Sequence, residues 1–272
     1  MILLVGGTGF LGSFVAARIA DRQPVVLVRR TSDVSVLPAG LTLRSGDLNT
    51  GLPLDGISTL IYCASMGFGH IPRLIEQLQH SDVTRAVFIS TTAIFTSLPS
   101  TSRGLRLEAE ATVQNSQLDW TILRPTMIYG TSRDRNISRL LKFLRRSPVF
   151  PLCGNALWQP IYVEDLADAV VAALDSSLTR RRMYNVAGAE ALRFSSLVET
   201  TARAINRHVR LIPVPVEAAV LAARVTRIVT AEQIRRLAED RAFSYADAAR
   251  DFNFAPRSFA EGVQLEAATL VA

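Results

Sequence analysis

The sequence predicts an α/β fold, a doubly wound parallel sheet followed by a small, mainly helical C-terminal lobe. Two observations indicate this class. Up to about residue 124, short continuous apolar runs alternate with segments of helical periodicity, which is typical of parallel strands buried on both faces. Beyond Pro125 the alternation gives way to helical segments and proline-containing turns. We therefore expect a sheet-forming core in residues 1–125 and a C-terminal lobe in residues 126–272.

Each element is expected from its own local pattern. The expected strands are the apolar runs 2–5, 25–28, 57–62, 84–89 and 118–123, with a further strand just before Asp47. Helical patterns lie between them at 11–20, 71–80 and 104–116. In the lobe, helices are expected near 135–146, 164–175, 194–206 and 216–240.

A glycine loop joins the first strand to the first helix. Gly6 and Gly9 let the backbone turn tightly and approach a ligand, and Gly12 lets the helix sit close to the sheet. The helix N-terminus offers N–H groups to an anion, and a preceding strand and a following helix are the context that supports such a loop. We expect it to hold a dinucleotide pyrophosphate through Gly6, Thr8, Gly9, Phe10, Leu11 and Gly12.

The second strand ends in Arg29 and Arg30 and has no acidic residue there. An acid at that point would bind the ribose hydroxyls of NAD, whereas arginine accommodates the additional phosphate of NADP. A guanidinium is a permanently charged fork that suits phosphate. We therefore expect NADP(H) in preference to NAD(H), the alternative being a solvated strand end in an arginine-rich chain.

Several segments together resemble one protein family. The loop Gly-Gly-Thr-Gly-Phe-Leu-Gly is similar to that of the extended and atypical short-chain dehydrogenase/reductase superfamily, in its NAD-dependent epimerase/dehydratase group. Further matching segments are Ser90–Ala93, Trp120–Pro125 with Tyr129–Gly130, Tyr162–Ala167 and Tyr184–Gly188. The resemblance covers nearly the whole chain. It implies an NAD(P)-binding Rossmann core and a substrate lobe that interleaves with it, because one late strand returns to the family's sheet.

The resemblance also implies cofactor contacts at the strand ends. Asp47, with Leu48, would contact the adenine. The segment after the fourth strand would pass along the ribose and nicotinamide, through Cys63, Ala64 and Ser65, and Pro125 would lie beside the cofactor at the end of its strand.

Reductases of this superfamily use a Tyr-x-x-x-Lys pair, whose spacing places both side chains on one helix face. The only lysine of this chain is Lys142, and the residue four positions before it is Ser138. Counting back from the strand at Trp120, the tyrosine position falls near Ser102 and the lysine position near Arg106. Arg106 can hydrogen-bond a nicotinamide ribose or stabilise an oxyanion, but arginine does not release a proton in proteins. A serine hydroxyl is a weak acid without a base beside it.

Other catalytic candidates are few. Thr91 matches the family's catalytic Ser/Thr and could orient a carbonyl. His70, in the loop after the fourth strand, could act as a general acid, the alternative being a surface or capping histidine. Arg133 and Arg135 could bind an anion, although exposed loop arginines usually have no specific role.

Nucleotide-sugar enzymes of the extended group usually carry an Arg-Asp pair ahead of the helix that begins near Val163. Here that stretch reads Leu157-Trp158-Gln159-Pro160. This departure disfavours a UDP- or GDP-sugar as the substrate.

Composition excludes several classes of protein. The net charge of +6 is spread along the chain, and we find no nucleic-acid-binding module. No apolar run reaches about 18 residues, and the first strand leaves no room for a signal peptide, so we expect a cytoplasmic protein without membrane partners. The two cysteines and three histidines are scattered, which argues against a disulfide framework and against a metal site. The expected partner is a small-molecule substrate, with the chain a monomer or homodimer.

Two functional hypotheses remain. The first is an NADP(H)-dependent enzyme of the epimerase/dehydratase type that acts on a small carbonyl or sugar-like substrate with a non-standard proton donor. The second is a non-catalytic NAD(P)H-binding protein, either a redox sensor resembling the NmrA-like proteins or an assembly or scaffold factor resembling the NDUFA-type subunits. The intact glycine loop argues against a degenerate fold that binds nothing.

Overall fold

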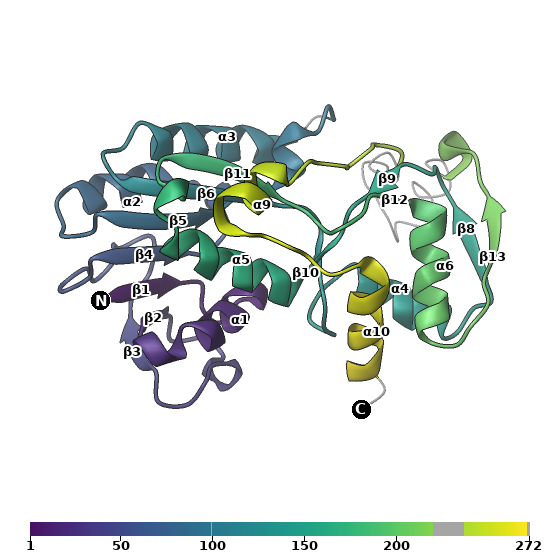
Figure 1. The fold of residues 1–272 in the computed structure, drawn as a ribbon, viewed down its shortest axis with the longest axis horizontal. Helices are drawn as coiled ribbons and strands as arrows, with labels where there is room; N and C mark the ends of the chain where they lie inside the picture. The colour runs from purple at the N-terminus through teal and green to yellow at the C-terminus, as the bar shows by residue number, and fades with distance from the viewer. Residues whose placement is uncertain (99, 220–236, 271–272) are drawn as a thin grey trace.

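The computed structural model describes residues 1–98, 100–219 and 237–270 of the chain. Its main feature is a sheet of seven parallel strands in the order β11-β6-β5-β4-β1-β2-β3 (Figure 1). The strand order reverses direction at β1, which lies between β2 and β4, and open α/β sheets bind their ligands at such a point. This is a doubly wound, Rossmann-like sheet, as the sequence predicted.

The seven strands are β1 (Ile2–Val5), β2 (Val25–Val28), β3 (Thr42–Ser45), β4 (Thr59–Tyr62), β5 (Arg85–Ile89), β6 (Asp119–Pro125) and β11 (Arg182–Val186). The strands β1, β2, β4, β5 and β6 fall on the five predicted apolar runs, whereas the sheet's two outer strands, β3 and β11, are more polar. The inner strands are continuous apolar runs because helices cover both of their faces, whereas most residues of the outer strand β3 are exposed.

Helices cover the two faces of the sheet, and successive strand residues point to opposite sides. Leu4 and Ile61 contribute to the hydrophobic cluster under α1 (Phe10–Arg18) and α5 (Val163–Asp175). On the opposite face, the cluster that includes Leu3, Leu60 and Phe88 packs against other helices, α2 (Ile71–Gln79) and α3 (Thr101–Gln114). Figure 1 shows the two helix pairs on either side of the strands.

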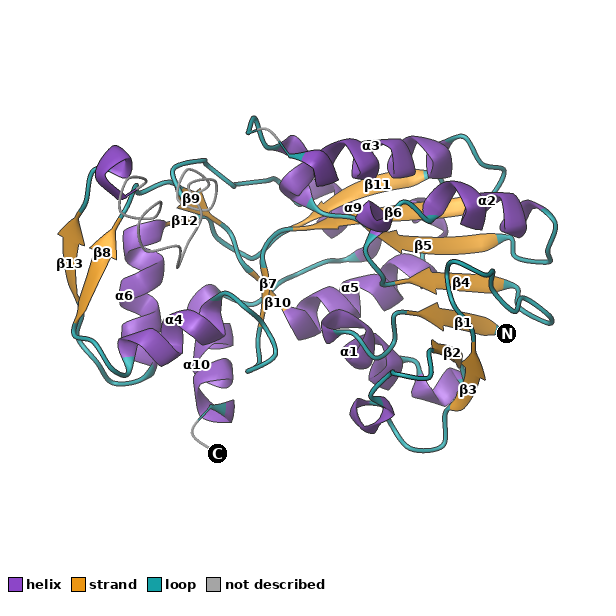
Figure 2. Ribbon diagram, turned by 180° about the vertical axis from the view of Figure 1, so that it is seen from behind, coloured by secondary structure: helices purple, strands orange, loops and turns teal. Residues whose placement is uncertain are grey.

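The smaller lobe lies beyond the carboxyl ends of the sheet strands (Figure 2). Its helices are α4 (Ile137–Leu144), α6 (Phe194–Ala204) and α10 (Phe259–Thr269). Three two-stranded ladders accompany them: β7 (Ile128–Tyr129) with β10 (Ile161–Tyr162), β9 (Leu157–Trp158) with β12 (Leu192–Arg193), and β8 (Val149–Leu152) with β13 (Arg210–Pro213). Most of the helix expected over 216–240 falls on residues 220–236, which lie outside the described residues.

Late segments of the chain also belong to the sheet layer. Strand β11 pairs with β6 in parallel register, and α9 (Ala246–Phe252) packs on it through Phe252, whose ring centroid is 5.2 Å from that of Tyr184. The Tyr184 hydroxyl donates to Asp251 at 2.7 Å. Residues after 125 therefore build part of the core as well as the smaller lobe. No described helix is both long enough and apolar enough to cross a membrane.

Candidate cofactor and active site

At two glycines of the loop, backbone atoms leave no space for a side chain. Gly6 has a φ of +79°, and a Cβ there would lie 2.8 Å from the backbone nitrogen of Ala64. A Cβ on Gly12 would lie 2.0 Å from the carbonyl oxygen of Gly6. The loop therefore folds tightly on itself and against the segment that follows β4, which only glycine permits at these positions.

Gly9 is less crowded, because a Cβ there would make one tight contact instead of a clash with several backbone atoms. Its φ is −71°, and a Cβ there would approach only the Gly6 oxygen, at 3.0 Å, among described atoms beyond its chain neighbours. Gly9 is the N-cap of α1, and no described side chain caps this helix. The first N–H groups of a helix have no intrahelical acceptor, so those of Phe10, Leu11 and Gly12 are available to an anion. These features fit a pyrophosphate.

A second group of residues lies at the ends of β2 and β3. Arg29 and Arg30 are exposed in the turn after β2, where the Arg29 N–H donates to Ser32 Oγ at 3.0 Å. Asp47 follows β3, and its carboxylate accepts the backbone N–H of Asn49 at 2.8 Å. This hydrogen bond lowers the pKa of Asp47, and the charges of Arg29 and His70 act in the same direction. Arg29, Asp47 and His70 thus share one electrostatic neighbourhood.

A third group lies at the end of β4. Cys63, Ala64 and Ser65 follow this strand, and Ser65 Oγ accepts the Gly67 N–H at 3.2 Å, which caps the short helix η3 (Met66–Phe68). Burial raises the pKa of the Cys63 thiol to about 12, so it is not a thiolate nucleophile at neutral pH. A Cβ on Gly67 would lie 3.3 Å from Arg106 Nε, so the Arg106 side chain lies over η3.

The structure brings Ser102 and Arg106 into direct contact. Arg106 Nη1 donates to Ser102 Oγ at 2.9 Å, as the four-residue spacing on α3 permits. Thr91 follows the adjacent strand β5, where its hydroxyl accepts the Ala93 N–H at 3.1 Å and caps η4 (Thr92–Phe95). Thr92 in turn donates to the carbonyl of Pro125 at 3.2 Å, which joins the ends of β5 and β6. These residues meet at the carboxyl edge of the sheet.

His70 lies in the segment between η3 and α2. It directly precedes α2, its ring centroid is 6.2 Å from that of Phe68, and its charge acts on Asp47. Its role as a proton donor stays a prediction.

Glu110 is a member of this region that sequence reasoning missed. Its side chain is 2% exposed, and it accepts hydrogen bonds from Ser90 Oγ and from the Arg124 guanidinium, whose Nε lies 3.0 Å from Oε1. Ser102, Arg106 and Glu110 are four residues apart, so they share one face of α3. That spacing was visible in the sequence and could have identified Glu110 as the residue that fixes α3 to the ends of β5 and β6.

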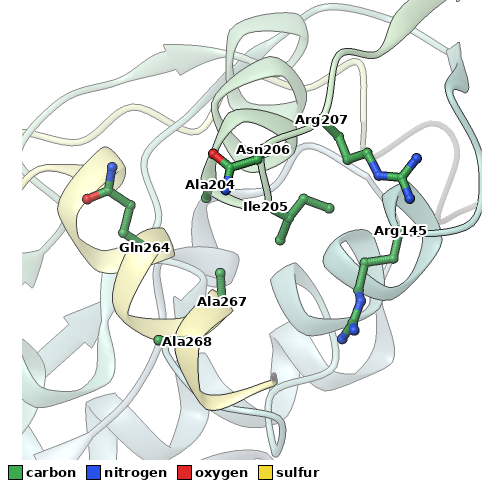
Figure 3. A pocket seen from close by; sticks show the side chains of 8 residues that line it. All are labelled: Arg145, Ala204, Ile205, Asn206, Arg207, Gln264, Ala267 and Ala268. Carbon is green, nitrogen blue, oxygen red and sulfur yellow. The ribbon is translucent and has the colours of Figure 1, made fainter. Parts of the chain in front are cut away.

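A hollow of about 730 Å³ in the smaller lobe is a competing location (Figure 3). Its lining comes from α6, α10 and the end of α4, and comprises Arg145, Ala204, Ile205, Asn206, Arg207, Gln264, Ala267 and Ala268. Arg145 Nη1 donates to the carbonyl of Leu270 at 3.1 Å, at the C-terminus of α10, where helices attract cationic side chains. Because this arginine has a structural role and none of the glycine-loop residues lines the hollow, we do not assign a site to it.

The sheet, the switch point and the glycine loop define an α/β protein with a Rossmann-like, dinucleotide-binding fold. The chain belongs to the NAD(P)H-binding family, whose model matches residues 6–177. The structure is similar to UDP-glucuronic acid 4-epimerase from Bacillus cereus in complex with NAD, with a TM-score of 0.76, 16% identity and coverage of 99% of this chain and 96% of that one.

Two relatives are similar in sequence. Over 253 residues the chain is 29% identical to NADH dehydrogenase [ubiquinone] 1 alpha subcomplex subunit 9, mitochondrial, of Arabidopsis thaliana. That match covers 80% of this chain but only 62% of the relative. Over 245 residues it is 27% identical to (4-alkanoyl-5-oxo-2,5-dihydrofuran-3-yl)methyl phosphate reductase of Streptomyces griseus subsp. griseus, covering 80% of this chain and 79% of that protein.

Proposed function

We propose that this protein is an NADP(H)-dependent oxidoreductase of the atypical short-chain dehydrogenase/reductase type that acts on a small carbonyl or sugar-like compound. The observation that carries the proposal is the position of Arg106, which lies over the segment after β4 and donates to Ser102 at 2.9 Å. A cation and hydroxyl groups thus gather at the sheet edge that also holds the glycine loop. The Streptomyces relative, named as a reductase, supports a reductive reaction.

The chain's own residues would perform distinct tasks. The chemistry that NADP(H) supplies when bound is hydride transfer. Thr91 would orient the substrate carbonyl, and the Arg106 guanidinium would stabilise negative charge on its oxygen. The proton would come from a donor other than a Tyr/Lys pair, either His70 or Ser102.

The stretch before α5 supports a substrate other than a nucleotide sugar. Gln159 is buried, its Nε2 donates to the Gly188 carbonyl at 2.7 Å, and its Oε1 accepts the Phe243 N–H at 2.8 Å. The side chain is therefore committed to internal contacts. It is not available to hold a sugar-nucleotide pyrophosphate.

NADPH is expected to bind more tightly than NADH, because Arg29 and Arg30 are exposed where the additional phosphate of NADP would lie. A hydrogen bond to a charged group contributes roughly 1.5–3 kcal/mol, so Arg29→Ala and Arg30→Ala should each weaken NADPH binding by about tenfold or more and leave NADH binding unchanged. Fluorescence titration measures this. Arg203→Ala, at an exposed arginine on α6, is the control. Equal affinity of the wild type for both nucleotides would contradict the preference.

NADPH should be consumed in the presence of at least one member of a panel of aldehydes, ketones and keto-sugars, at a rate proportional to protein concentration. If His70 donates the proton, His70→Ala lowers kcat by about 100-fold, the usual size of a general-acid contribution. His80→Ala is the control, because His80 is exposed at the other end of α2. Loss of activity in Ser102→Ala with His70→Ala unaffected would assign the donor to Ser102 instead.

The second candidate is a non-catalytic NAD(P)H-binding sensor or assembly factor. Two observations favour it: the sequence predicts Ser102 and Arg106 near the positions of the Tyr/Lys pair, and one relative is named as a subunit of NADH dehydrogenase. In that case NADPH binds without being oxidised by any substrate of the panel, and light scattering detects a cofactor-dependent change in assembly. That pair of results would replace the enzyme proposal.

A further inference from the structure

An arginine of the smaller lobe reaches the glycine loop. Arg133 lies in the segment between β7 and α4, and its Nη2 donates to the carbonyl oxygen of Thr8 at 2.9 Å. Its Nη1 donates to Ser13 Oγ at 3.0 Å. One contact precedes the N-cap of α1 and the other follows its first turn. The guanidinium therefore bridges the part of the loop that contains the unbonded helix N–H groups.

The guanidinium has capacity for a further acceptor. Arginine offers five N–H donors, and these two contacts use two of them. Its positive charge also acts at the start of η2 (Val34–Val36), where it lowers the pKa of Asp33, although the hydrogen bonds from Ser35 are the larger cause. An anion at the N-terminus of α1 would thus meet backbone N–H groups and a cation together.

Asp134 holds the backbone just after Arg133 in place. Asp134 is 6% exposed, and its Oδ1 accepts the backbone N–H groups of Asn136 at 2.7 Å and Ser138 at 3.2 Å. Glu266 on α10 is fully buried, and this burial raises its pKa to about 10, with the charge of Asp134 acting in the same direction. A segment held in this way presents Arg133 without a large ordering cost on binding.

We propose that Arg133 binds the pyrophosphate of the nicotinamide nucleotide and so connects the smaller lobe directly to the bound cofactor. The proposal rests on NAD(P)H binding by the glycine loop. Arg133 would bind the pyrophosphate, whereas Arg29 and Arg30 would bind the 2′-phosphate of the same ligand.

The test is a titration with three ligands that carry different phosphates. NADH has the pyrophosphate alone, 2′-AMP has the 2′-phosphate alone, and NADPH has both. Arg133→Ala is expected to weaken the binding of NADH and of NADPH by about tenfold and to leave the affinity for 2′-AMP unchanged. Arg29→Ala and Arg30→Ala should show the opposite pattern, with NADH unchanged. Arg139→Ala, at an exposed arginine on the nearby helix α4, is the control.

Arg133→Lys keeps the positive charge but loses the planar guanidinium. It should therefore reduce the affinity for NADH less than Arg133→Ala does. This variant also serves if the alanine variant is poorly folded. NADH affinity within twofold of the wild type in both variants would overturn the proposal and leave Arg133 as a contact between lobes. An equal loss for 2′-AMP would overturn the assignment to the pyrophosphate. A wild type that binds neither NADH nor NADPH would overturn the cofactor assignment itself.

Discussion

Gly9→Val is expected to weaken NADPH and NADH binding by at least 100-fold while the protein remains folded. The backbone of Gly9 has a φ of −71° and a ψ of 174°, which valine adopts readily, and a Cβ there meets only the Gly6 oxygen among described atoms beyond its neighbours. The new side chain would occupy the space in front of the helix N–H groups, where the pyrophosphate must lie. Replacing this N-cap should lower the free energy of unfolding by about 1 kcal/mol.

Circular dichroism and fluorescence titration together measure both effects. Two other glycines serve as controls, one where a side chain would clash within the loop and one where it would meet nothing. Gly12→Ala places a Cβ 2.0 Å from the Gly6 carbonyl and should destabilise the loop itself, whereas Gly104→Ala on α3 meets no described atom within 4 Å and should be neutral or slightly stabilising. Retained nucleotide binding in a folded Gly9→Val variant would show that the loop does not hold the phosphates.

The main sheet and the glycine loop could be predicted because both depend on local patterns. A strand buried on both faces requires a continuous apolar run, and Leu3, Leu4 and Val5 supply one that ends directly at Gly6. The loop needs residues without side chains at Gly6 and Gly12 for reasons that act within a few residues. The contact between Ser102 and Arg106 follows equally from a four-residue spacing on one helix.

Contacts between distant segments could not be obtained in this way. Arg133 binds the carbonyl of Thr8, a residue 125 positions earlier, and nothing in the local sequence of either segment specifies that approach. The sequence marked Arg133 only as a loop arginine that could bind an anion. Its position depends on how the segment between β7 and α4 lies against α1, which the contacts of Arg133 with Thr8 and Ser13 show only in the folded structure.

His70 illustrates the same limit within the core. The sequence placed it correctly after the fourth strand, at the ligand-binding edge of the sheet. The edge is wide, however, and the direction of the loop decides which part of it a side chain reaches. In the structure His70 directly precedes α2, and its ring centroid lies 6.2 Å from that of Phe68.

Glu110→Ala is expected to lower the free energy of unfolding by about 3–5 kcal/mol, the usual cost of removing one partner of a buried ion pair. The Glu110 and Arg124 side chains are 2% and 16% exposed, so the substitution leaves a nearly buried guanidinium without its carboxylate, and Ser90 without its acceptor. Urea denaturation measures the loss. Glu108→Ala, at an exposed glutamate on the same helix, should change stability by about 0.5 kcal/mol or less.

The double variant Glu110→Leu with Arg124→Met should recover much of the lost stability, because apolar side chains of similar volume often replace a buried ion pair without net cost. This double variant would separate the contribution of the Glu110–Arg124 ion pair to stability from its effect on the site. Glu110 contacts Ser90, the neighbour of Thr91, and is one helical turn from Arg106, but it makes no described contact with the glycine loop. The rescued variant should therefore bind NADPH normally and lose turnover only if the ion pair positions Thr91 and Arg106. An effect of Glu110→Ala no larger than that of Glu108→Ala would show that the pair does not anchor α3.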